Sequence, residues 1–577
     1  MIKLFRFLSS YKLPIAAVLL FTFLQTLSEL YLPTLMADIV DSGIMQGDVP
    51  YIWKIGSVML LVAAGGTLFS LLAAYLSSKT SAGFGRLIRS KVFGHVENFS
   101  LQEFDKIGTA SLINRTTNDI TQVQQVLNMM MRMMVMAPMM CIGGIIMAIS
   151  EDAKLSWVIV AVIPVLAVSI YLIASKGMPY FKVMQVKLDK LNLVLREGLT
   201  GIRVIRSFNR TAHESWRFES ANRDLTDTAL RVNRIMAAMM PVMMLVLNLS
   251  TVAIVWFGGL RIESGGMQVG SLMAFIQYAM QIMFSLIMLS FMFVMIPRAQ
   301  VSAVRINEVL QMAPVINDPQ LARRAQHKGG SGYVEFKDVT FSYPGAEKPA
   351  LTGISFRASP GEVTAIIGGT GSGKTTLISL IPRFYDVQSG SVTIDGVDVR
   401  EMKQDALREK IGFVPQKAVL FSGTISENIR YGKEDADDRE VRHAARIAQA
   451  EDFITAMDGG FDAKISQGGA NVSGGQKQRL SIARALVRKP DIYIFDDSFS
   501  ALDFKTDAKL RAALKAETTE STVLIVAQRV STVMDADRII VLDEGEIAGT
   551  GTHAELMATN RVYREIVESQ LTEEEIA

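Results

Sequence analysis

Six apolar stretches in the N-terminal half of the chain constrain its fold more than any other feature. A helix needs about 20 apolar residues to cross the hydrocarbon core of a bilayer, and each stretch is long enough. Because lipid offers no partners for backbone polar groups, we expect every stretch to be helical. The expected spans are Pro14–Ile39, Ile55–Leu76, Met129–Ile149, Leu155–Ala174, Ile235–Leu260 and Val269–Ile296.

Composition indicates that the rest of the chain lies in water. Of the 577 residues, 49% are hydrophobic and 20% are charged, which is too much charge for a chain buried wholly in lipid. Beyond residue 333 short apolar strands alternate with helical patterns, as in an α/β domain. We therefore expect an all-α six-helix transmembrane domain over residues 1–315, a linker over 316–332 and an α/β domain over 333–577.

Basic residues predict the orientation of the spans. The loops after the second and fourth spans are long and rich in Lys and Arg, whereas the loops after the other spans are short. By the positive-inside rule, the long loops and both termini are expected on the cytoplasmic side of a plasma (inner) membrane. Basic segments can also bind nucleic acid, but the positive-inside rule already accounts for the Lys and Arg residues of the long loops. We therefore expect the lipid bilayer, and no nucleic acid, as a partner.

Ionisable residues inside the spans suggest a functional cavity. Glu29 and Arg132 lie at or near membrane depth, where a charge is costly unless it faces a cavity or a partner. They line a substrate cavity, or they form a structural pair, or Arg132 reaches back to the membrane surface. Asp38 and Asp41, at the outer end of the first span, either latch an outer gate or are solvated loop charges.

Methionine is frequent, with 32 residues, many of them in the third, fifth and sixth spans. Met side chains are flexible and polarisable, so they suit a cavity that repacks around varied apolar ligands. Two other interpretations stay open. The side chains fill the core or face lipid, or their thioethers bind a soft metal ion.

The strongest chemical signal is a P-loop. It follows an apolar strand, Val363–Ile367, and opens an expected helix, Thr376–Phe384. Backbone N–H groups of such a loop surround phosphate oxygens, the lysine holds the β- and γ-phosphates, and the hydroxyl after it ligates Mg²⁺. The pattern predicts binding of ATP or GTP by Gly368, Gly369, Thr370, Gly371, Ser372, Gly373, Lys374 and Thr375.

A second apolar strand, Ile492–Phe495, ends in two carboxylates. An acidic residue at the carboxyl end of a parallel strand beside a P-loop is placed to hold the metal ion, and Asp496 fits that position. The next position, Asp497, normally carries the carboxylate that polarises the attacking water.

Further motifs carry a family resemblance. Val472-Ser473-Gly474-Gly475-Gln476 lies between the P-loop and the Asp496 strand, and Ser500-Ala501-Leu502-Asp503 follows that strand. Phe341-Ser342-Tyr343 precedes the P-loop, and Phe413-Val414-Pro415-Gln416 follows it. In this order, after six spans, they resemble the motifs of a type IV (exporter-type) ABC half-transporter. The resemblance implies an ATPase that couples ATP hydrolysis to transport, with ATP and Mg²⁺ as cofactors.

The resemblance also implies roles for single residues. Tyr343 would stack on adenine, Thr376 would complete the phosphate site, and Gln416 would join Thr375 and Asp496 in sensing Mg²⁺. The signature residues Ser473, Gly474, Gly475 and Gln476 would contact the nucleotide of an opposing subunit. Asp503 would be the D-loop residue of this chain. Phe104–Thr109 and the region around Phe208–Trp216 would be the two coupling helices.

Two positions depart from the family pattern. The expected catalytic Glu is Asp497, and the expected switch His is Gln528. The Asp carboxylate falls short by about 1 Å, an error that costs on the order of 100-fold in rate, and a neutral Gln supplies no imidazole. The chain's own site is therefore predicted to bind ATP and hydrolyse it slowly. Its signature is intact apart from Val472, which replaces the usual Leu.

This asymmetry predicts a heterodimer with a second, homologous half-transporter, in which the intact signature completes the partner's site. The expected function is export of amphipathic or hydrophobic compounds (drugs, lipids or peptides), as in multidrug-type exporters. A slow homodimer, an importer of metal chelates and a mainly regulatory ATP-binding subunit are the alternatives.

Overall fold

The computed structural model describes residues 2–323 and 331–570, and the chain divides into two compact units. The first unit runs to Glu97 and resumes over Ala110–Met312, and the second combines Asn98–Thr109 with the residues from Ala313 onward. The segment Asn98–Thr109, which sequence places in the membrane domain, thus packs with the second unit. Of the expected linker, residues 324–330 lie outside the described residues.

The first unit is all helical. Among the described residues, six helices are long and apolar enough to cross a membrane, and the predicted spans fall in them. The elements in order are α1 (Ile2–Phe5), η1 (Arg6–Tyr11), α2 (Lys12–Asp38), η2 (Ile39–Ile44), α3 (Val49–Val96), α5 (Thr109–Asn114), η3 (Arg115–Asp119), α6 (Ile120–Glu151), α7 (Ser156–Thr200), α8 (Ile202–Ser207), α9 (Thr211–Ala237), α10 (Met239–Glu263) and α11 (Val269–Gln311).

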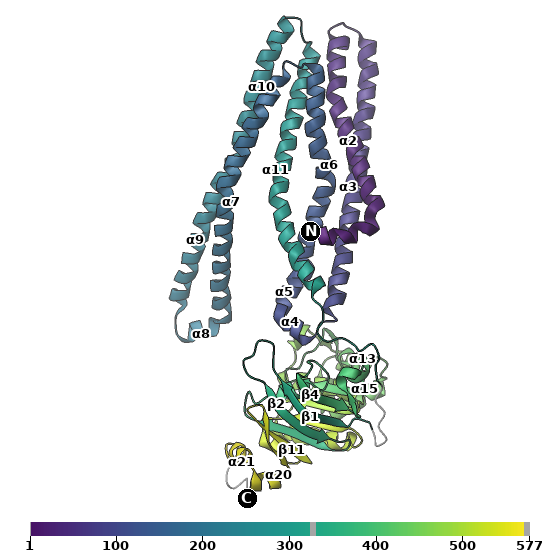
Figure 1. Cartoon of the computed structure of the whole chain (residues 1–577), viewed down its shortest axis with the longest axis vertical. Coiled ribbons are helices and arrows are strands. Elements are labelled where there is room, and N and C mark those ends of the chain that lie inside the picture. Colours follow the sequence, from purple (N-terminus) through teal and green to yellow (C-terminus); the bar gives the residue numbers. More distant parts are fainter. Residues whose placement is uncertain (1, 324–330, 571–577) are drawn as a thin grey trace. The chain divides into compact units, whose positions relative to one another are not determined.

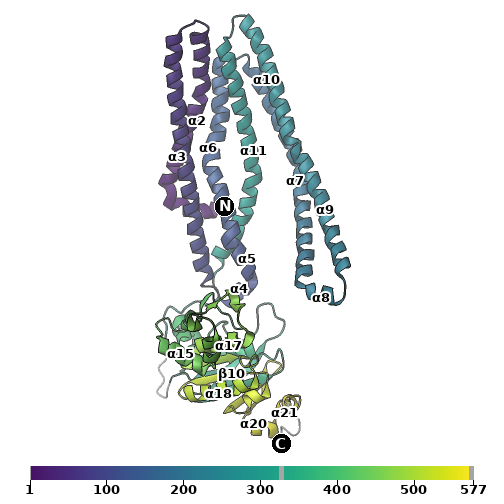
Figure 2. The ribbon, with the colours of Figure 1, turned by 180° about the vertical axis from the view of Figure 1, so that it is seen from behind.

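Four of these helices form a bundle. In both views α2, α3, α6 and α11 run side by side, and α7 and α9 form a long hairpin with α8 at its tip (Figure 1, Figure 2). α6 packs on α11, and α2 packs on α3. The core of the bundle contains Leu30 from α2 and the fully buried ring of Tyr278 from α11. These contacts fix the relative positions of α2, α6 and α11. Glu29 lies on α2 and Arg132 lies on α6.

The helices continue well beyond the apolar spans, but the second short turn helix is not where the sequence suggested. The expectation of a coupling helix around Phe208–Trp216 is wrong: the short helix is α8, and Thr211 already starts α9. Asn209 adopts a left-handed conformation with φ of 51°, and the Arg210 N–H bonds the Ile205 carbonyl at 2.9 Å. This reversal ends α8 before Phe208.

The second unit contains three sheets. A four-stranded antiparallel sheet has the order β2-β1-β4-β5, a six-stranded sheet has the order β12-β11-β3-β10-β9-β6, and β7 pairs with β8. The strands are β1 (Val334–Phe341), β2 (Leu351–Ala358), β3 (Val363–Gly368), β4 (Ser389–Ile394), β5 (Val397–Asp398), β6 (Ile411–Val414), β7 (Gly423–Thr424), β8 (Lys464–Ile465), β9 (Ile492–Asp496), β10 (Thr522–Val526), β11 (Arg538–Asp543) and β12 (Glu546–Gly551).

Both faces of the six-stranded sheet are covered. Along β3, Ala365 and Ile367 face one apolar core, and Ile366 faces the other, because successive side chains of a strand point to opposite faces. The strands pair in parallel except for β12. The helices of this unit are α4 (Leu101–Ile107), α12 (Lys374–Ser379), α13 (Gln404–Glu409), α14 (Ile425–Arg430), α15 (Asp438–Ile447), α16 (Glu451–Ala456), α17 (Gly474–Leu486), α18 (Phe504–Glu517), α19 (Val530–Val533), α20 (His553–Thr559) and α21 (Arg561–Glu568).

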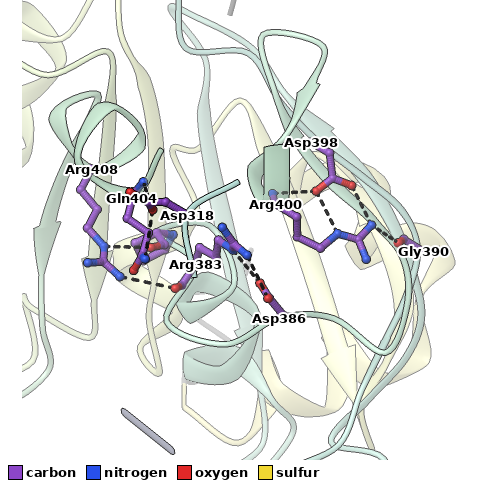
Figure 3. Close-up of polar contacts among 9 residues, drawn as sticks. Asp318, Arg383, Asp386, Gly390, Asp398, Arg400, Gln404 and Arg408 are labelled. Carbon is purple, nitrogen blue, oxygen red and sulfur yellow. Dashed lines mark hydrogen bonds and ion pairs between the residues drawn. The ribbon is translucent and has the colours of Figure 1, made fainter. Parts of the chain in front are cut away.

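The first part of the linker is held against α13. The Asp318 carboxylate accepts hydrogen bonds from the Gln404 backbone N–H at 3.0 Å and from its side-chain amide at 3.2 Å (Figure 3). Nearby, Arg408 donates to the Arg383 carbonyl, and Arg383 pairs with Asp386 at 2.8 Å (Figure 3). The first part of the linker is therefore bound to α13, and α13 is in turn bonded to the segment that follows the P-loop helix.

Candidate functional site

The P-loop joins the carboxyl end of β3 to α12, and its glycines are required by geometry. Gly371 and Gly373 have φ of 85° and 97°, a region that side chains rarely adopt. A Cβ at Gly373 would lie 2.8 Å from the Ala350 carbonyl oxygen. Only glycine therefore lets the loop close against β2. The helix after the loop is shorter than expected, since α12 ends at Ser379 rather than at Phe384.

Lys374 extends across the loop. Its ammonium donates to the carbonyl oxygens of Gly368 at 2.9 Å and Gly369 at 2.7 Å. Burial lowers the pKa of Lys374, and the charges of Asp497 and Asp496 oppose that effect. The cation thus lies at the site where phosphate oxygens would meet the loop.

Asp496 and Thr375 lie together beside the P-loop. The Thr375 hydroxyl donates to Asp496 Oδ1 at 3.0 Å, and the Asp496 side chain is buried. Burial raises the pKa of Asp496, and the Thr375 hydrogen bond opposes the shift. A hydroxyl and a carboxylate oxygen are ligands that Mg²⁺ prefers when phosphates supply the rest of its shell. This pair therefore fits a magnesium ion bound together with a nucleotide.

Asp497 and Gln416 lie beside this pair. The Gln416 side-chain amide donates to Asp497 Oδ2 at 3.2 Å, and the Asp497 backbone N–H bonds the Val526 carbonyl at 2.9 Å. Asp497 is 8% exposed and has a left-handed φ of 46°. The strand order explains the grouping, because β6, β9, β10 and β3 are neighbours and their carboxyl ends share one edge of the sheet.

Gln528 follows β10 at the same edge, and its side chain is exposed. Its backbone is held by Gln570, a residue that the sequence did not single out. The Gln570 amide nitrogen donates to the Gln528 carbonyl at 2.8 Å, and the amide oxygen accepts from the Val530 N–H at 2.9 Å. No motif marks Gln570, because a lone Gln after a C-terminal helix carries no pattern.

Tyr343 belongs to a cluster of aromatic rings. Its hydroxyl lies 2.9 Å from the Thr376 hydroxyl, and its ring is edge-on to Phe341 and Tyr385. Burial raises the pKa of Tyr385 to about 12. Tyr343 is 37% exposed, so its ring is available for stacking next to the P-loop. Sequence reasoning missed Tyr385, since only the fold brings it to Tyr343.

The signature residues start α17. Ser473 accepts from the Gln476 N–H at 3.3 Å, and the Gln476 side chain accepts from the Ser473 N–H at 2.8 Å. This reciprocal cap orders the helix start, and Ser473 and Gly474 are exposed. A Cβ at Gly475 would lie 3.1 Å from the Ala501 carbonyl oxygen. Asp503 caps α18 through the Thr506 N–H at 3.0 Å, a bond that lowers the pKa of Asp503.

Over the described residues no hydrogen bond or ion pair joins the signature to the P-loop of the same chain. The two halves of a nucleotide site are thus present on separate elements, one at the sheet edge and one at an exposed helix start.

Comparison with known proteins identifies the chain. Residues 15–286 match the family described as ABC transporter transmembrane region, and residues 351–500 match the family described as ABC transporter. An uncharacterized ABC transporter ATP-binding protein of Mycobacterium tuberculosis is 45% identical over 97% of this chain and 96% of its own length. The chain belongs to the ABC transporter family.

Other similarities indicate the type of ABC transporter. The ATP-dependent lipid A-core flippase of Vibrio parahaemolyticus is 30% identical over 99% of this chain and 98% of its own length. A solved structure of a bacterial Atm1-family ABC exporter with ATP bound has a TM-score of 0.81 and 26% identity, covering 97% of this chain and 98% of its own.

The prediction of a six-helix transmembrane domain followed by an α/β ABC domain is confirmed. The chain is an exporter-type half-transporter, a multi-pass membrane protein whose ATPase domain drives export. A half-transporter needs a second ABC half, so this chain acts as part of a dimer.

In the membrane unit of this ABC transporter, Glu29 and Arg132 do not form an ion pair over the described residues. Glu29 Oε1 instead accepts from the Gln25 amide at 2.9 Å. Glu29 lines a cavity of about 290 Å³ together with Met136, Met140, Met280 and others. The structural-pair interpretation is therefore wrong, and Arg132 is not among the residues that line this cavity.

Asp41 is not a solvated loop charge. Its carboxylate accepts from the backbone N–H groups of Gly270 at 2.6 Å and Ser271 at 3.0 Å, where the positive end of the α11 dipole favours an anion. Sequence reasoning missed a second connection at this end of the unit, the ion pair of Arg261 with buried Asp152 at 2.8 Å. Both contacts join elements that are distant in the sequence.

Proposed function

We propose that this chain is the degenerate-site subunit of a heterodimeric exporter in the bacterial plasma membrane, with both termini in the cytoplasm. ATP would bind at the P-loop residues, with Tyr343 on the adenine, and Thr375, Asp496 and Gln416 would hold Mg²⁺. When bound, Mg²⁺ would neutralise negative charge that develops on the phosphate oxygens. The transmembrane domain extends to about residue 315, and the nucleotide-binding domain begins at about residue 333.

The observation that carries this proposal is the residue pair at the sheet edge. Asp497 occupies the position of the carboxylate that polarises water, and Gln528 the position of the switch His. Asp497 Oδ2 also accepts a hydrogen bond from the Gln416 amide at 3.2 Å, which competes with a water molecule for this oxygen. The site keeps every group that holds ATP and lacks the longer carboxylate and the imidazole that would speed hydrolysis.

The exposed signature supports the second half of the proposal. The Gly474 backbone N–H and the Ser473 hydroxyl lie at the exposed start of α17, and helix starts bind phosphate oxygens. A partner chain with an intact Glu and His would place its own nucleotide there. Hydrolysis then occurs at the partner's P-loop, and this chain supplies the signature.

Exposed apolar side chains outside the spans support association with a second chain. Along α7, α9 and their connection, several are well exposed, including Val186 at 68%, Phe208 at 74% and Trp216 at 67%. A partner chain that covered these side chains would remove their apolar area from water. ATP binding draws the two nucleotide domains together, and the segments Asn98–Thr109 and Ile202–Ser207 pass that motion to the spans.

The substrate is an amphipathic or hydrophobic compound. The Met-rich cavity beside Glu29 supports this assignment, as does the similarity to a protein named as a lipid A-core flippase. Thioether side chains adapt to apolar groups of different shape.

Purification of the chain alone and with the half-transporter encoded next to it tests the proposal. We expect slow ATP hydrolysis by the chain alone and turnover on the order of 100-fold faster for the pair. Lys374→Ala in the lone chain gives the background rate. Brisk turnover by the lone chain, abolished by Lys374→Ala, would show a homodimer and refute the heterodimer.

A further inference from the structure

A cavity of about 290 Å³ lies inside the membrane unit between α2, α6 and α11. Most of its wall is apolar or thioether, with Glu29, Gln281 and Ser285 as the polar residues. The lining residues are Glu29, Met136, Ala137, Met140, Met280, Gln281, Phe284, Ser285 and Met288. A carboxylate in such surroundings is costly unless a cation or several donors face it.

Hydrogen bonds leave part of this polar wall unused. Glu29 Oε1 accepts from the Gln25 amide nitrogen at 2.9 Å, whereas Oε2 receives no hydrogen bond from the described residues. The Gln281 amide nitrogen donates to the Glu29 backbone carbonyl at 3.2 Å. Its amide oxygen is buried without a partner, and so is that of Gln25, a side chain only 5% exposed.

The orientation of both amides is fixed by chemistry. Each faces an oxygen of Glu29, so the amide nitrogen must point toward that oxygen and the amide oxygen away from it. The Ser285 hydroxyl already donates to the Ile282 carbonyl at 2.7 Å. The unpartnered oxygens of the set are therefore hydrogen-bond acceptors, each amide nitrogen keeps one further N–H, and the lining contains neither Lys nor Arg nor His.

A wall with one carboxylate, unpartnered amide oxygens and no basic side chain complements a ligand that brings both positive charge and N–H donors. It does not complement an anion, which would face the Glu29 charge with no cation to offset it. The four methionines and Phe284 would enclose the apolar part of such a ligand, and an aromatic face also attracts a cation. The volume accommodates an organic group rather than a single metal ion.

We propose that this cavity binds the protonated amine end of an amphipathic organic cation, with Glu29 and Gln281 as the acceptors. The assignment rests on the proposed export function, since it names the substrate class for the same transmembrane domain. Glu29 makes the cavity prefer a positively charged ligand, and the methionines determine which apolar groups of the ligand fit.

Three matched fluorescent probes test the charge preference. A dansyl group on an undecyl chain ends in an amine, an alcohol or a carboxylate, and each probe is titrated against the full chain in nanodiscs of neutral lipid. We expect the amine to bind at least about ten-fold more tightly than the carboxylate, because charge-assisted hydrogen bonds are stronger than neutral ones. Glu29→Gln should weaken amine binding by about ten-fold and change alcohol binding by less than about two-fold.

Two variants serve as controls. Glu29→Asp keeps the charge and should retain most of the preference for the amine, and Glu263→Gln, at the exposed end of α10, should bind like the unchanged chain. Alcohol binding shows that each variant is folded. Equal binding of the three probes, tighter binding of the carboxylate, or an unchanged preference in Glu29→Gln would overturn the proposal.

Displacement of the amine by micromolar Ag⁺, an analogue of Cu⁺, would also overturn it and assign the methionines to a soft metal. The titration uses no nucleotide and no partner chain. A failure of the heterodimer proposal would therefore appear in the ATPase rates and leave these affinities unchanged.

Discussion

At the scale of single residues, the backbone conformation of Asp497 limits which substitutions can test the proposed degenerate site. A left-handed φ of 46° is adopted more readily by Asp than by most residues, so Asp497→Glu must hold a longer side chain on the same strained position. We predict that Asp497→Glu with Gln528→His raises hydrolysis at this chain's own site by about 10- to 100-fold, because the carboxylate regains about 1 Å of reach.

The rate is measured as ATP turnover in a heterodimer whose partner carries an inactive P-loop. Asp497→Gln with Gln528→His is the matched control, since Gln has the length of Glu without its charge. If the Glu and Gln variants hydrolyse ATP equally slowly while remaining folded, the two positions are not the cause of slow turnover.

Gln570 gives a second prediction at the residue scale. Its amide bonds both the Gln528 carbonyl and the Val530 N–H, so Gln570→Leu leaves two backbone groups without partners. A lost partner of this kind costs about 1–3 kcal/mol where the group is buried. We expect faster hydrogen exchange over residues 527–531 and a weaker response of that segment to ATP.

Ser569→Ala is the control for this variant, because the Ser569 hydroxyl bonds only the Ile566 carbonyl within its own helix turn. Exchange that rises equally over the whole second unit would indicate general destabilisation instead of a local role for Gln570.

At the scale of elements, the start of α11 approaches the end of α2 closely. A Cβ at Gly270 would overlap the Ala37 carbonyl and lie 2.7 Å from Asp41 Oδ2. We predict that Gly270→Ala lowers the thermal unfolding midpoint of the detergent-solubilised chain by several degrees, since forced displacement of packed groups costs about 1–3 kcal/mol.

Gly259→Ala is the matched control, because a Cβ there meets nothing within 4 Å, and Ala in a helix is about 1 kcal/mol more favourable than Gly. An unfolding midpoint for Gly270→Ala at or above that of Gly259→Ala would contradict the close approach of α2 and α11.

Some helices, strands and site residues could be predicted from the sequence, and others could not. The spans and the P-loop strand follow from apolar length and from glycine spacing, which are local properties. Strand order then explains why Asp496 and Gln416 meet at one edge. The position of α8 was mistaken, because it depends on the left-handed conformation of Asn209, which apolar periodicity does not reveal. Tyr385 and Gln570 were missed because only tertiary contacts give them a role.

At the scale of the whole molecule, one chain contains a P-loop side and a signature side, and only the P-loop side lacks the Glu and His of the family pattern. The P-loop side has Asp497 and Gln528 in place of Glu and His, and the signature side is ordered by a reciprocal cap between Ser473 and Gln476. The two sides serve different nucleotides in the proposed heterodimer. Substitutions on the two sides should therefore have different effects on transport-coupled turnover.

We predict that Ser473→Ala lowers turnover of the heterodimer by about 100-fold, because it removes a donor that meets the phosphate of the partner's nucleotide. Asp497→Asn in the same chain should change turnover by less than about three-fold, a factor worth roughly 0.7 kcal/mol.

Thr424→Ala controls for the loss of a helix cap, since Thr424 and Glu427 form the same reciprocal cap on α14. Steady-state ATPase of the reconstituted pair measures all three variants. If Ser473→Ala and Asp497→Asn lower turnover equally, both sites hydrolyse ATP and the prediction is wrong. If Ser473→Ala and Thr424→Ala lower turnover equally, the effect of Ser473→Ala comes from a lost helix cap and not from a lost contact with the nucleotide.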